Sequence, residues 1–335
     1  MIISKDRLAQ ECAMLNRLTV GLLDEGIQVI RVVPECQMEQ TPKFGTAVSF
    51  ANQIEVSMPV PRMLRKKRRD EVVELFLKQN VEMVFGFGKD AMQLALDIEK
   101  VLEINVLCEV LSMKAAKKVK RKSRIWRWFA PTPSIEQEIA RRVGPERTAL
   151  IPLGVTNHHT IHATDRVSKK CIVLLDAAND YKNSAEILAL LAAKSNVHLF
   201  IEMTGKHQQR LWKQITTLSM HDRVTCLHDV GALRALVVQA DLLVLPSVTM
   251  EVRTVLLDAM LSEVPTLATQ IQGFDMLIDE ETAIISNGSW DSSLSLLLDD
   301  KRICERIGSN GSSLIAQKYG SAVQIAAFKA SFTLN

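Results

Sequence analysis

The sequence predicts an α/β protein built of two doubly wound, Rossmann-like domains that face each other across a cleft. Apolar runs of strand length alternate with helical patterns along most of the 335 residues, which is typical of βαβ units and parallel sheets. The polar stretch Thr156–Lys170 interrupts this alternation and divides it into two series. Two such series predict two parallel sheets, each covered by helices.

The first series begins with the very short strand expected in the opening residues MIIS. A helix is predicted over Arg7–Asp24, where apolar residues recur close to a 3.6-residue period until Gly26. Further helices are expected at Arg65–Gln79 and Ala91–Leu102. The other strands are expected at Gln28–Val33, Val81–Phe85, Asn105–Glu109, Trp128–Ala130 and Ala149–Ile151.

The second series repeats this alternation and ends in helices. Its strands are expected at Cys171–Leu175, Val197–Glu202, Arg223–Leu227, Leu242–Leu245 and Thr266–Ala268. We therefore predict an N-terminal domain over residues 1–157, a linker over 158–170, a C-terminal domain over 171–318 and a helical tail over 319–335.

The composition is that of an ordinary globular protein, with 47% hydrophobic and 24% charged residues, and it argues against disorder. No apolar run approaches the roughly 18 residues of a membrane-spanning helix, and the first residues lack the order of a signal peptide, so a cytoplasmic location is expected by default. The six cysteines are dispersed singly without C-x-x-C spacing, which predicts reduced core residues.

Positive charge is concentrated in the first half, where residues 1–150 carry 25 Lys and Arg against 19 Asp and Glu. Much of it lies in Arg62–Arg69 and in Lys114–Arg127, which is followed at once by Trp128 and Phe129. Lys114–Arg127 has three interpretations: contact with the anionic inner face of a membrane, contact with nucleic acid phosphates, or a solvated surface whose Trp128 and Phe129 enter the core. We prefer the third, and we rank nucleic acid last.

The most informative segment is Ala240–Thr269, which predicts a buried strand, a polar loop, a helix and a second buried strand within thirty residues. This layout brings the start of a helix beside the carboxyl end of a strand, which is where ligands bind in open α/β sheets. Backbone N–H groups at a helix start favour anions such as a diphosphate. The segment therefore indicates a nucleotide site.

Ala240–Thr269 resembles the donor-binding segment of retaining, nucleotide-sugar-dependent glycosyltransferases of the GT-B fold, group 1, whose pattern is PS-x-x-E-G-F-G-x-x-x-x-E-A-M-A-x-G-x-P-V-V-A-T. The residues that keep the pattern are Pro246, Ser247, Asp258, Ala259, Met260, Pro265, Ala268 and Thr269, with Asp258 in place of a glutamate. Other segments extend the resemblance over most of the chain. The resemblance implies the two-domain fold, transfer of a hexose-type sugar with retention, and a donor site that needs no metal or cofactor.

Several positions of the donor segment depart from the family. Met250 stands where the family has its first glutamate, and a thioether cannot accept hydrogen bonds from sugar hydroxyls as a carboxylate does, unless Glu251 turns in to replace it. Asp258 can still accept from ribose hydroxyls, with about one methylene less reach. Glu251 and Arg253 replace the two glycines of this loop, which places side chains where backbone would approach the phosphates.

The resemblance also implies binding roles outside this segment. Lys182 fits the family's phosphate-binding lysine, whereas the family's arginine is Ala177 here, so that half of a cationic clamp is missing unless Arg253 or Lys206 supplies it. Gly205 lies in the loop that resembles the family's nucleotide contact, and His228 in the one that resembles its nucleobase contact.

In the first domain the resemblance to an active enzyme weakens. Residues 1–157 contain no histidine, and Leu111 and Ser112 occupy the positions of the family's His-Asp pair. Lys5 and Asp6 follow the first strand in place of a glycine-rich loop.

Two other motifs give weaker evidence of function. His158, His159 and His162 have H-x-x-H spacing but lie in a polar stretch without nearby cysteine, so we do not expect a metal site. Gly86–Asp90 lacks the spacing of a P-loop and is interpreted as a strand-to-helix turn.

Two functions follow from these observations. In the first, the protein transfers a sugar from a nucleoside diphosphate sugar to an acceptor hydroxyl of a saccharide or lipid-linked saccharide. Glu251 and Lys182 are then the catalytic candidates, and the donor is held by Lys182, Gly205, His228, Arg253, Thr254, Val255 and Asp258. In the second, the chain is catalytically silent and serves as a nucleotide- or partner-binding scaffold.

Overall fold

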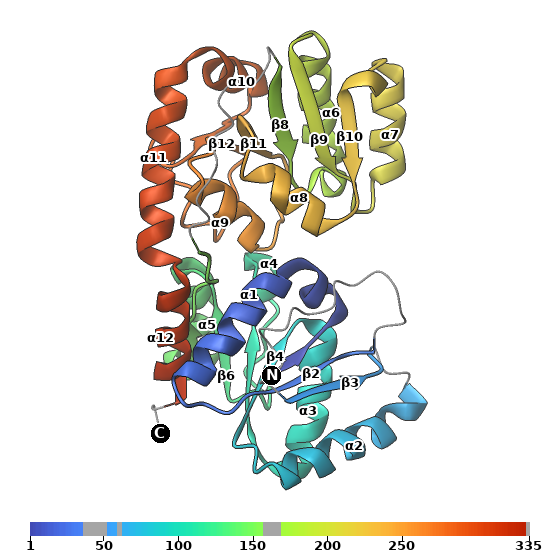
Figure 1. Ribbon diagram of the computed structural model, residues 1–335, viewed down its shortest axis with the longest axis vertical. Coiled ribbons are helices and arrows are strands. Elements are labelled where there is room, and N and C mark those ends of the chain that lie inside the picture. The colour runs from blue at the N-terminus through green and yellow to red at the C-terminus, as the bar shows by residue number, and fades with distance from the viewer. Residues whose placement is uncertain (36–51, 59–61, 157–168, 333–335) are drawn as a thin grey trace. The chain divides into compact units, whose positions relative to one another are not determined.

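The computed structural model describes residues 1–35, 52–58, 62–156 and 169–332, without the side chains of Arg62 and Val230. The H-x-x-H residues His158, His159 and His162, where no metal site is expected, and most of the predicted linker lie outside these ranges. The chain forms two compact units, one of residues 1–154 together with 321–335 and one of residues 155–320. Each is an α/β unit with a parallel sheet, as the sequence predicts (Figure 1).

The first unit contains a seven-stranded sheet in the order β3-β2-β1-β4-β5-β6-β7. Its strands are β1 (Ile2–Ile3), β2 (Ile30–Pro34), β3 (Asn52–Val56), β4 (Met83–Phe87), β5 (Asn105–Glu109), β6 (Arg127–Ala130) and β7 (Thr148–Leu150). Its helices are α1 (Lys5–Asp24), α2 (Arg65–Lys78), α3 (Lys89–Leu102), α4 (Met113–Ala116), α5 (Pro133–Val143) and α12 (Ser321–Phe332), with short 3-10 turns at Arg62–Leu64 and Pro145–Arg147.

The last helix, α12, belongs to the first unit although it follows the second in sequence. It runs beside α1, where Gly21 lets the helices approach closely because a Cβ there would meet Ile325 at 2.1 Å. Phe328 packs against Phe85 and Phe129, with ring centroids 5.0 Å and 5.6 Å away. This aromatic cluster packs α12 against the strands β4 and β6 of the sheet.

The second unit contains a six-stranded sheet in the order β10-β9-β8-β11-β12-β13. Its strands are β8 (Lys170–Leu174), β9 (Val197–Glu202), β10 (Val224–Leu227), β11 (Leu242–Leu245), β12 (Thr266–Ala268) and β13 (Ile284–Ile285). Its helices are α6 (Tyr181–Ala192), α7 (Gln208–Thr217), α8 (Val230–Val237), α9 (Thr254–Leu261), α10 (Trp290–Asp299) and α11 (Lys301–Lys318), with 3-10 turns at Ala177–Asn179 and His221–Arg223.

The central strands of the second unit are buried on both faces, as continuous apolar runs predict. Every residue of β11 is buried, and its neighbour β8 places Ile172, Val173 and Leu174 in the same core. The helix α9 is buried along its whole length, including Thr254 and Asp258. A polar side chain in such surroundings requires a partner, and these partners define the candidate site.

The structure also contains strands that the sequence interpretation missed. Strand β3 pairs with β2 at the edge of the first sheet, and four of its five residues are exposed or half-buried. Strand β13 is two residues long and pairs with β12. Within the described residues, no helix is long and apolar enough to cross a bilayer.

Candidate functional site

The order of the strands in the second unit creates a switch point between β8 and β11. From β8 the chain continues to β9 and β10 on one side, and from β11 to β12 and β13 on the other. The loops that follow β8 and β11 therefore leave the carboxyl edge of the sheet in opposite directions, and a ligand site is expected between them. The helices α6 and α9 both begin at this edge.

Hydrogen bonds hold the loop after β8 against the loop after β11. Asn183, in the first turn of α6, donates from Nδ2 to the carbonyl oxygen of Pro246, at 2.8 Å. Asp180 caps the same helix by accepting from the backbone N–H of Asn183, at 3.2 Å. The Ser184 hydroxyl donates to the carbonyl oxygen of Ala177, at 2.8 Å. The two sides of the switch point are thus fixed relative to one another.

A half-buried acid, Asp176, follows β8 at this edge. Its backbone is left-handed, with φ 56°, and its N–H donates to the carboxylate of Glu202 at 2.8 Å. Burial raises the pKa of the Asp176 carboxyl, and nearby Glu202 raises it further, while hydrogen bonds with Asn179 and Ser247 and the charge of Arg253 oppose that rise. The pattern residue Ser247 therefore contacts this acid.

The side chain of Arg253 is buried and pairs with Glu202 at the end of β9. Its Nη1 donates to both carboxylate oxygens, at 2.9 Å and 3.0 Å. The Arg253 and Glu202 side chains are 8% and 4% exposed. Among the described residues, the Nε and Nη2 atoms of Arg253 have no hydrogen-bond partner. Arg253 thus fills space at the start of α9 where the family pattern has a glycine.

A second arginine contacts two residues of α9, its first residue and one a turn further along. Arg234, in α8, donates from Nη1 to Oδ2 of Asp258 and from Nη2 to the hydroxyl oxygen of Thr254, the latter at 2.8 Å. The side chain of Asp258 is 3% exposed and that of Arg234 is 20% exposed. Oδ1 of Asp258 is buried without a hydrogen-bond partner in the described part of the chain. The carboxylate predicted to accept from ribose is therefore already ion-paired through one oxygen.

The remaining predicted residues lie around these pairs. Lys182 is exposed in the first turn of α6, and Lys206 is exposed in the loop after β9. His228 is exposed after β10. Val255 is buried in the first turn of α9. These residues all belong to segments that follow the carboxyl ends of strands in one sheet.

The two positions predicted to contact the donor sugar differ in exposure. Met250 is buried, so its thioether belongs to the core, whereas Glu251 is exposed beside it. Glu251 therefore has the freedom to turn toward a ligand, and its role stays a prediction.

Gly205 is required by a close approach between two loops. Its φ is +154°, and a Cβ there would lie 2.8 Å from the backbone of Ala178. The N–H of His207 donates to the carbonyl oxygen of Ala178 at 2.9 Å, which holds the loop after β9 against the loop after β8. Gly205 thus shapes the edge of the sheet through packing.

The corresponding edge of the first unit is filled by a buried ion cluster. Arg7 binds Glu109 through two contacts, Nε to Oε1 at 2.6 Å and Nη2 to Oε2 at 3.0 Å, and lies 3.4 Å from Glu11. Leu111 and Ser112, at the positions of the family's His-Asp pair, are both buried, and Ser112 caps α4 by accepting from the N–H of Ala115.

The basic segment Lys114–Arg127 is exposed at its charges and buried at its aromatic end. Arg147 holds it in place by donating to the carbonyl oxygens of Arg121 and Ser123, both at 2.8 Å. Trp128 and Phe129 are core residues of β6, which confirms the interpretation that they enter the core. Association of the exposed lysines with an anionic membrane stays a prediction.

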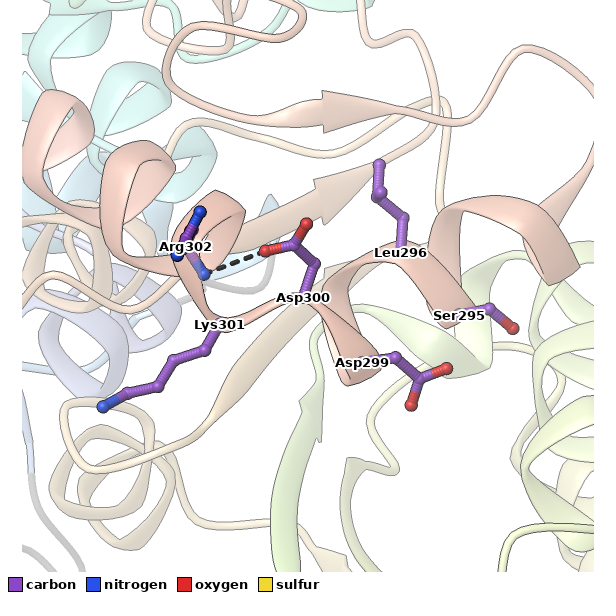
Figure 2. Close-up of a pocket in the computed structure, with 6 residues that line it drawn as sticks. All are labelled: Ser295, Leu296, Asp299, Asp300, Lys301 and Arg302. Carbon is purple, nitrogen blue, oxygen red and sulfur yellow. Dashed lines mark hydrogen bonds between the residues drawn. The ribbon is translucent and has the colours of Figure 1, made fainter.

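A shallow surface hollow lies at the junction of α10 and α11, lined by Leu296, Asp300 and Arg302 among others (Figure 2). Lys170, the first residue of β8, donates to the carbonyl oxygen of the nearby Leu298, so the hollow is at the amino edge of the sheet, opposite the switch point. Among the described residues, no group of three or more His, Cys, Asp or Glu side chains is arranged to hold a metal ion.

Two of the residues that build the site escaped the sequence interpretation. Glu202 ends a predicted strand, and Arg234 lies in a helix that is otherwise apolar or small, VGALRALV. A lone arginine in such a helix is a signal that could have been noticed, because a buried or half-buried guanidinium needs an acceptor.

Known proteins are similar to this chain in the sequence of the second unit and in the fold. Residues 169–296 match the family model of glycosyl transferases group 1. No curated protein matches the chain.

Solved structures with the same fold cover nearly the whole chain. Sucrose-phosphate synthase from Thermosynechococcus elongatus has a TM-score of 0.77 at 16% identity, over 100% of this chain and 99% of its own. The Anabaena protein HepE, in complex with UDP-glucose, has a TM-score of 0.74 at 14% identity, over 98% of this chain and 99% of its own. A glycosyltransferase from Rickettsia africae has a TM-score of 0.70 at 12% identity, over 99% of this chain and 96% of its own. With two Rossmann-like units and a second unit that matches group 1, the chain is similar to glycosyltransferases of the GT-B fold.

Proposed function

We propose that the protein binds a nucleoside diphosphate sugar at the carboxyl edge of the second sheet and transfers the sugar to an acceptor hydroxyl. The observation that carries this proposal is the switch point between β8 and β11, where the first turns of α6 and α9 lie at the end of the central strands. The N–H groups at a helix start and nearby cations favour a diphosphate. The match of residues 169–296 to group 1 supports the same chemistry.

Five of the predicted residues have roles in this proposal. Lys182 is exposed and free to approach the phosphates, where a cation stabilises the departing diphosphate. The amides of Thr254 and Val255 begin α9 and would contact the diphosphate. Asp258 would accept from ribose through Oδ1, the oxygen that does not bind Arg234. Glu251 would accept from the sugar.

A uridine diphosphate hexose is the first donor to test, because HepE, which shares the fold, was crystallised with UDP-glucose. We expect transfer with retention of the anomeric configuration and an acceptor that is a saccharide or a lipid-linked saccharide. Proton NMR of the anomeric hydrogen in the product distinguishes retention from inversion.

The test is the thermal stability of the purified protein with UDP, GDP, ADP and their sugars. A ligand at about one hundred times its dissociation constant raises the free energy of unfolding by roughly 2.7 kcal/mol. We expect a shift for one nucleotide and none for that nucleotide in Lys182→Ala. Lys301→Ala, which removes an exposed lysine at the opposite edge of the sheet, should keep the shift. The absence of a shift with every nucleotide would reject the proposal.

A second function, a silent nucleotide- or partner-binding protein, is favoured by two observations. Met250 is buried in the position of the family's first glutamate, and Asp258 is ion-paired with Arg234. The two functions differ in turnover. Mass spectrometry of donor and acceptor mixtures detects transfer or donor hydrolysis in the first and neither in the second, and nucleotide binding without turnover in any acceptor mixture would favour the second.

A further inference from the structure

Two arginines lie at the start of α9, where acidic residues are the more favourable neighbours. Arg253 is the residue before the helix, and no side chain caps it there. Arg234 donates to the Thr254 hydroxyl, which places a second guanidinium against the first residue of the helix. Cations near a helix N-terminus oppose the helix dipole. By contrast, α6 and α8, which start at the same edge, are capped by the acids Asp180 and Asp229.

Both guanidinium groups are held in place by carboxylates. Glu202 holds Arg253 and Asp258 holds Arg234, and neither carboxylate lies in the first turn of α9. Replacing such a pair with apolar residues is often neutral or stabilising, so stability alone gives no reason for two of them at one helix start. Their effect is to fix two cations in defined positions, which is the arrangement that binds an anion with little reorganisation.

Unused polar atoms at the same place indicate a ligand. Oδ1 of Asp258 and the Nε and Nη2 atoms of Arg253 are buried without a hydrogen-bond partner among the described residues. Side chains that are nine-tenths buried seldom leave such atoms unsatisfied. Arg234 is the more accessible of the two arginines, with 20% of its side chain exposed against 8% for Arg253. A ligand that arrives from solvent therefore meets Arg234 first.

We propose that Arg234 binds the diphosphate of the donor, with Asp258 as the residue that positions its guanidinium. This inference rests on the proposed function and assigns the phosphate charge to a cation from α8. A guanidinium suits the task because it is planar, always charged and has several N–H donors, and Arg234 directs one nitrogen to Asp258 and another to Thr254. Arg253, deeper and tied to Glu202, supports the same helix start.

The test compares a diphosphate with its nucleoside. The wild-type dissociation constants are measured by calorimetry for UDP, GDP and ADP and, by competition, for uridine, guanosine and adenosine. The variant is Arg234→Gln combined with Asp258→Asn, which removes a cation and an anion together and leaves no buried carboxylate without its partner. Arg234→Lys is a second variant that keeps the charge but loses the fork.

We expect the double variant to bind the preferred diphosphate roughly ten- to a hundred-fold more weakly. The affinity for its nucleoside should change far less, because the oxygen that Asp258→Asn keeps can still accept from ribose. Arg234→Lys should fall between the double variant and the wild type. Arg302→Gln, which removes an exposed cation at the opposite edge of the sheet, should bind like the wild type.

The outcomes separate this inference from the function on which it rests. If the wild type prefers the diphosphate and the double variant keeps the same preference, Arg234 does not bind the phosphates, although the nucleotide site stands. If the wild type binds no nucleotide, the proposed function and this inference both fail. Thermal unfolding of each variant shows whether it is folded at the temperature of the titration.

Discussion

The two sheets present the same kind of edge but contain different chemistry there. Each has a switch point, between β1 and β4 in the first unit and between β8 and β11 in the second. In the first, Arg7, Glu11 and Glu109 form an ion cluster whose side chains are at most 4% exposed. In the second, Arg234 is partly exposed, and Lys182 and Glu251 are exposed. Topology thus provides a switch point in each sheet, and the candidate site residues lie at the second.

The difference teaches that a buried ion pair has two uses in one protein. In the first unit it joins α1 to the end of β5, and its side chains are buried. In the second, the pairs hold guanidinium groups at a helix start, and that of Arg234 is partly exposed to solvent. Burial alone therefore does not identify a site, whereas a cation that a carboxylate holds at a partly exposed helix start is within reach of a ligand.

The largest effect on the free energy of unfolding is expected from removing the cation at the edge of the first sheet. Arg7→Met leaves the buried carboxylates of Glu11 and Glu109 without their guanidinium, and breaking a buried pair in this way costs about 3–5 kcal/mol. Amide hydrogen exchange, read by mass spectrometry of peptides from each unit, should show faster exchange in the first unit. Lys78→Ala, which breaks the exposed pair with Glu74, should change the free energy of unfolding and the exchange rates far less, because solvent screens that pair. Equal effects of both substitutions would contradict a structural role for the cluster.

A smaller effect on stability is expected from adding a methyl group between the loops at the edge of the second sheet. Gly205→Ala would bring a Cβ within 2.8 Å of the Ala178 backbone, and overpacking of this kind costs about 1–3 kcal/mol. The matched control is Gly288→Ala, because Gly288 also has a positive φ, +106°, but nothing lies within 4 Å of its Cβ position. The thermal unfolding midpoint should fall more for Gly205→Ala. If both variants unfold alike, the contact between the loops after β8 and β9 is not what requires glycine.

The smallest effect concerns the pH dependence of the second edge. The folded-state pKa of Asp176 is raised above its ordinary 3.8, so the folded protein keeps this proton to a higher pH than the unfolded chain does. Stability contributed by this carboxyl is therefore lost as the pH rises from 3.8 through the folded pKa. Asp176→Asn removes that loss. The thermal unfolding midpoint of the variant should therefore rise relative to that of the wild type as the pH rises from 4 to 7. A difference that is constant over this range would show that Asp176 does not titrate differently in the folded state.

Much of the fold could be predicted because it depends on local patterns. The apolar runs of β5, β9, β11 and β12 predicted those strands residue for residue, since strands buried on both faces need continuous apolar sequence. Strand β3 was missed because its sequence, NQIEV, is mostly polar, as suits a mostly exposed edge strand. The helix α12 was predicted as a tail. Its packing depends on the absence of a side chain at Gly21 of α1 and on contacts of Phe328 with aromatic residues that are far away in the sequence.

The sequence by itself determined the alternation of strands and helices, the place of Pro246 and Ser247 at the end of a central strand, and the excess of positive charge in the first half. These three features follow from periodicity and composition, which can be read in each segment without its tertiary contacts. Only the tertiary structure decided that Arg253 pairs with Glu202, 51 residues away, and Arg234 with Asp258, 24 residues away. Such pairs form because the sheet brings the ends of separate strands and helices to one edge, and a buried charge must find its partner there.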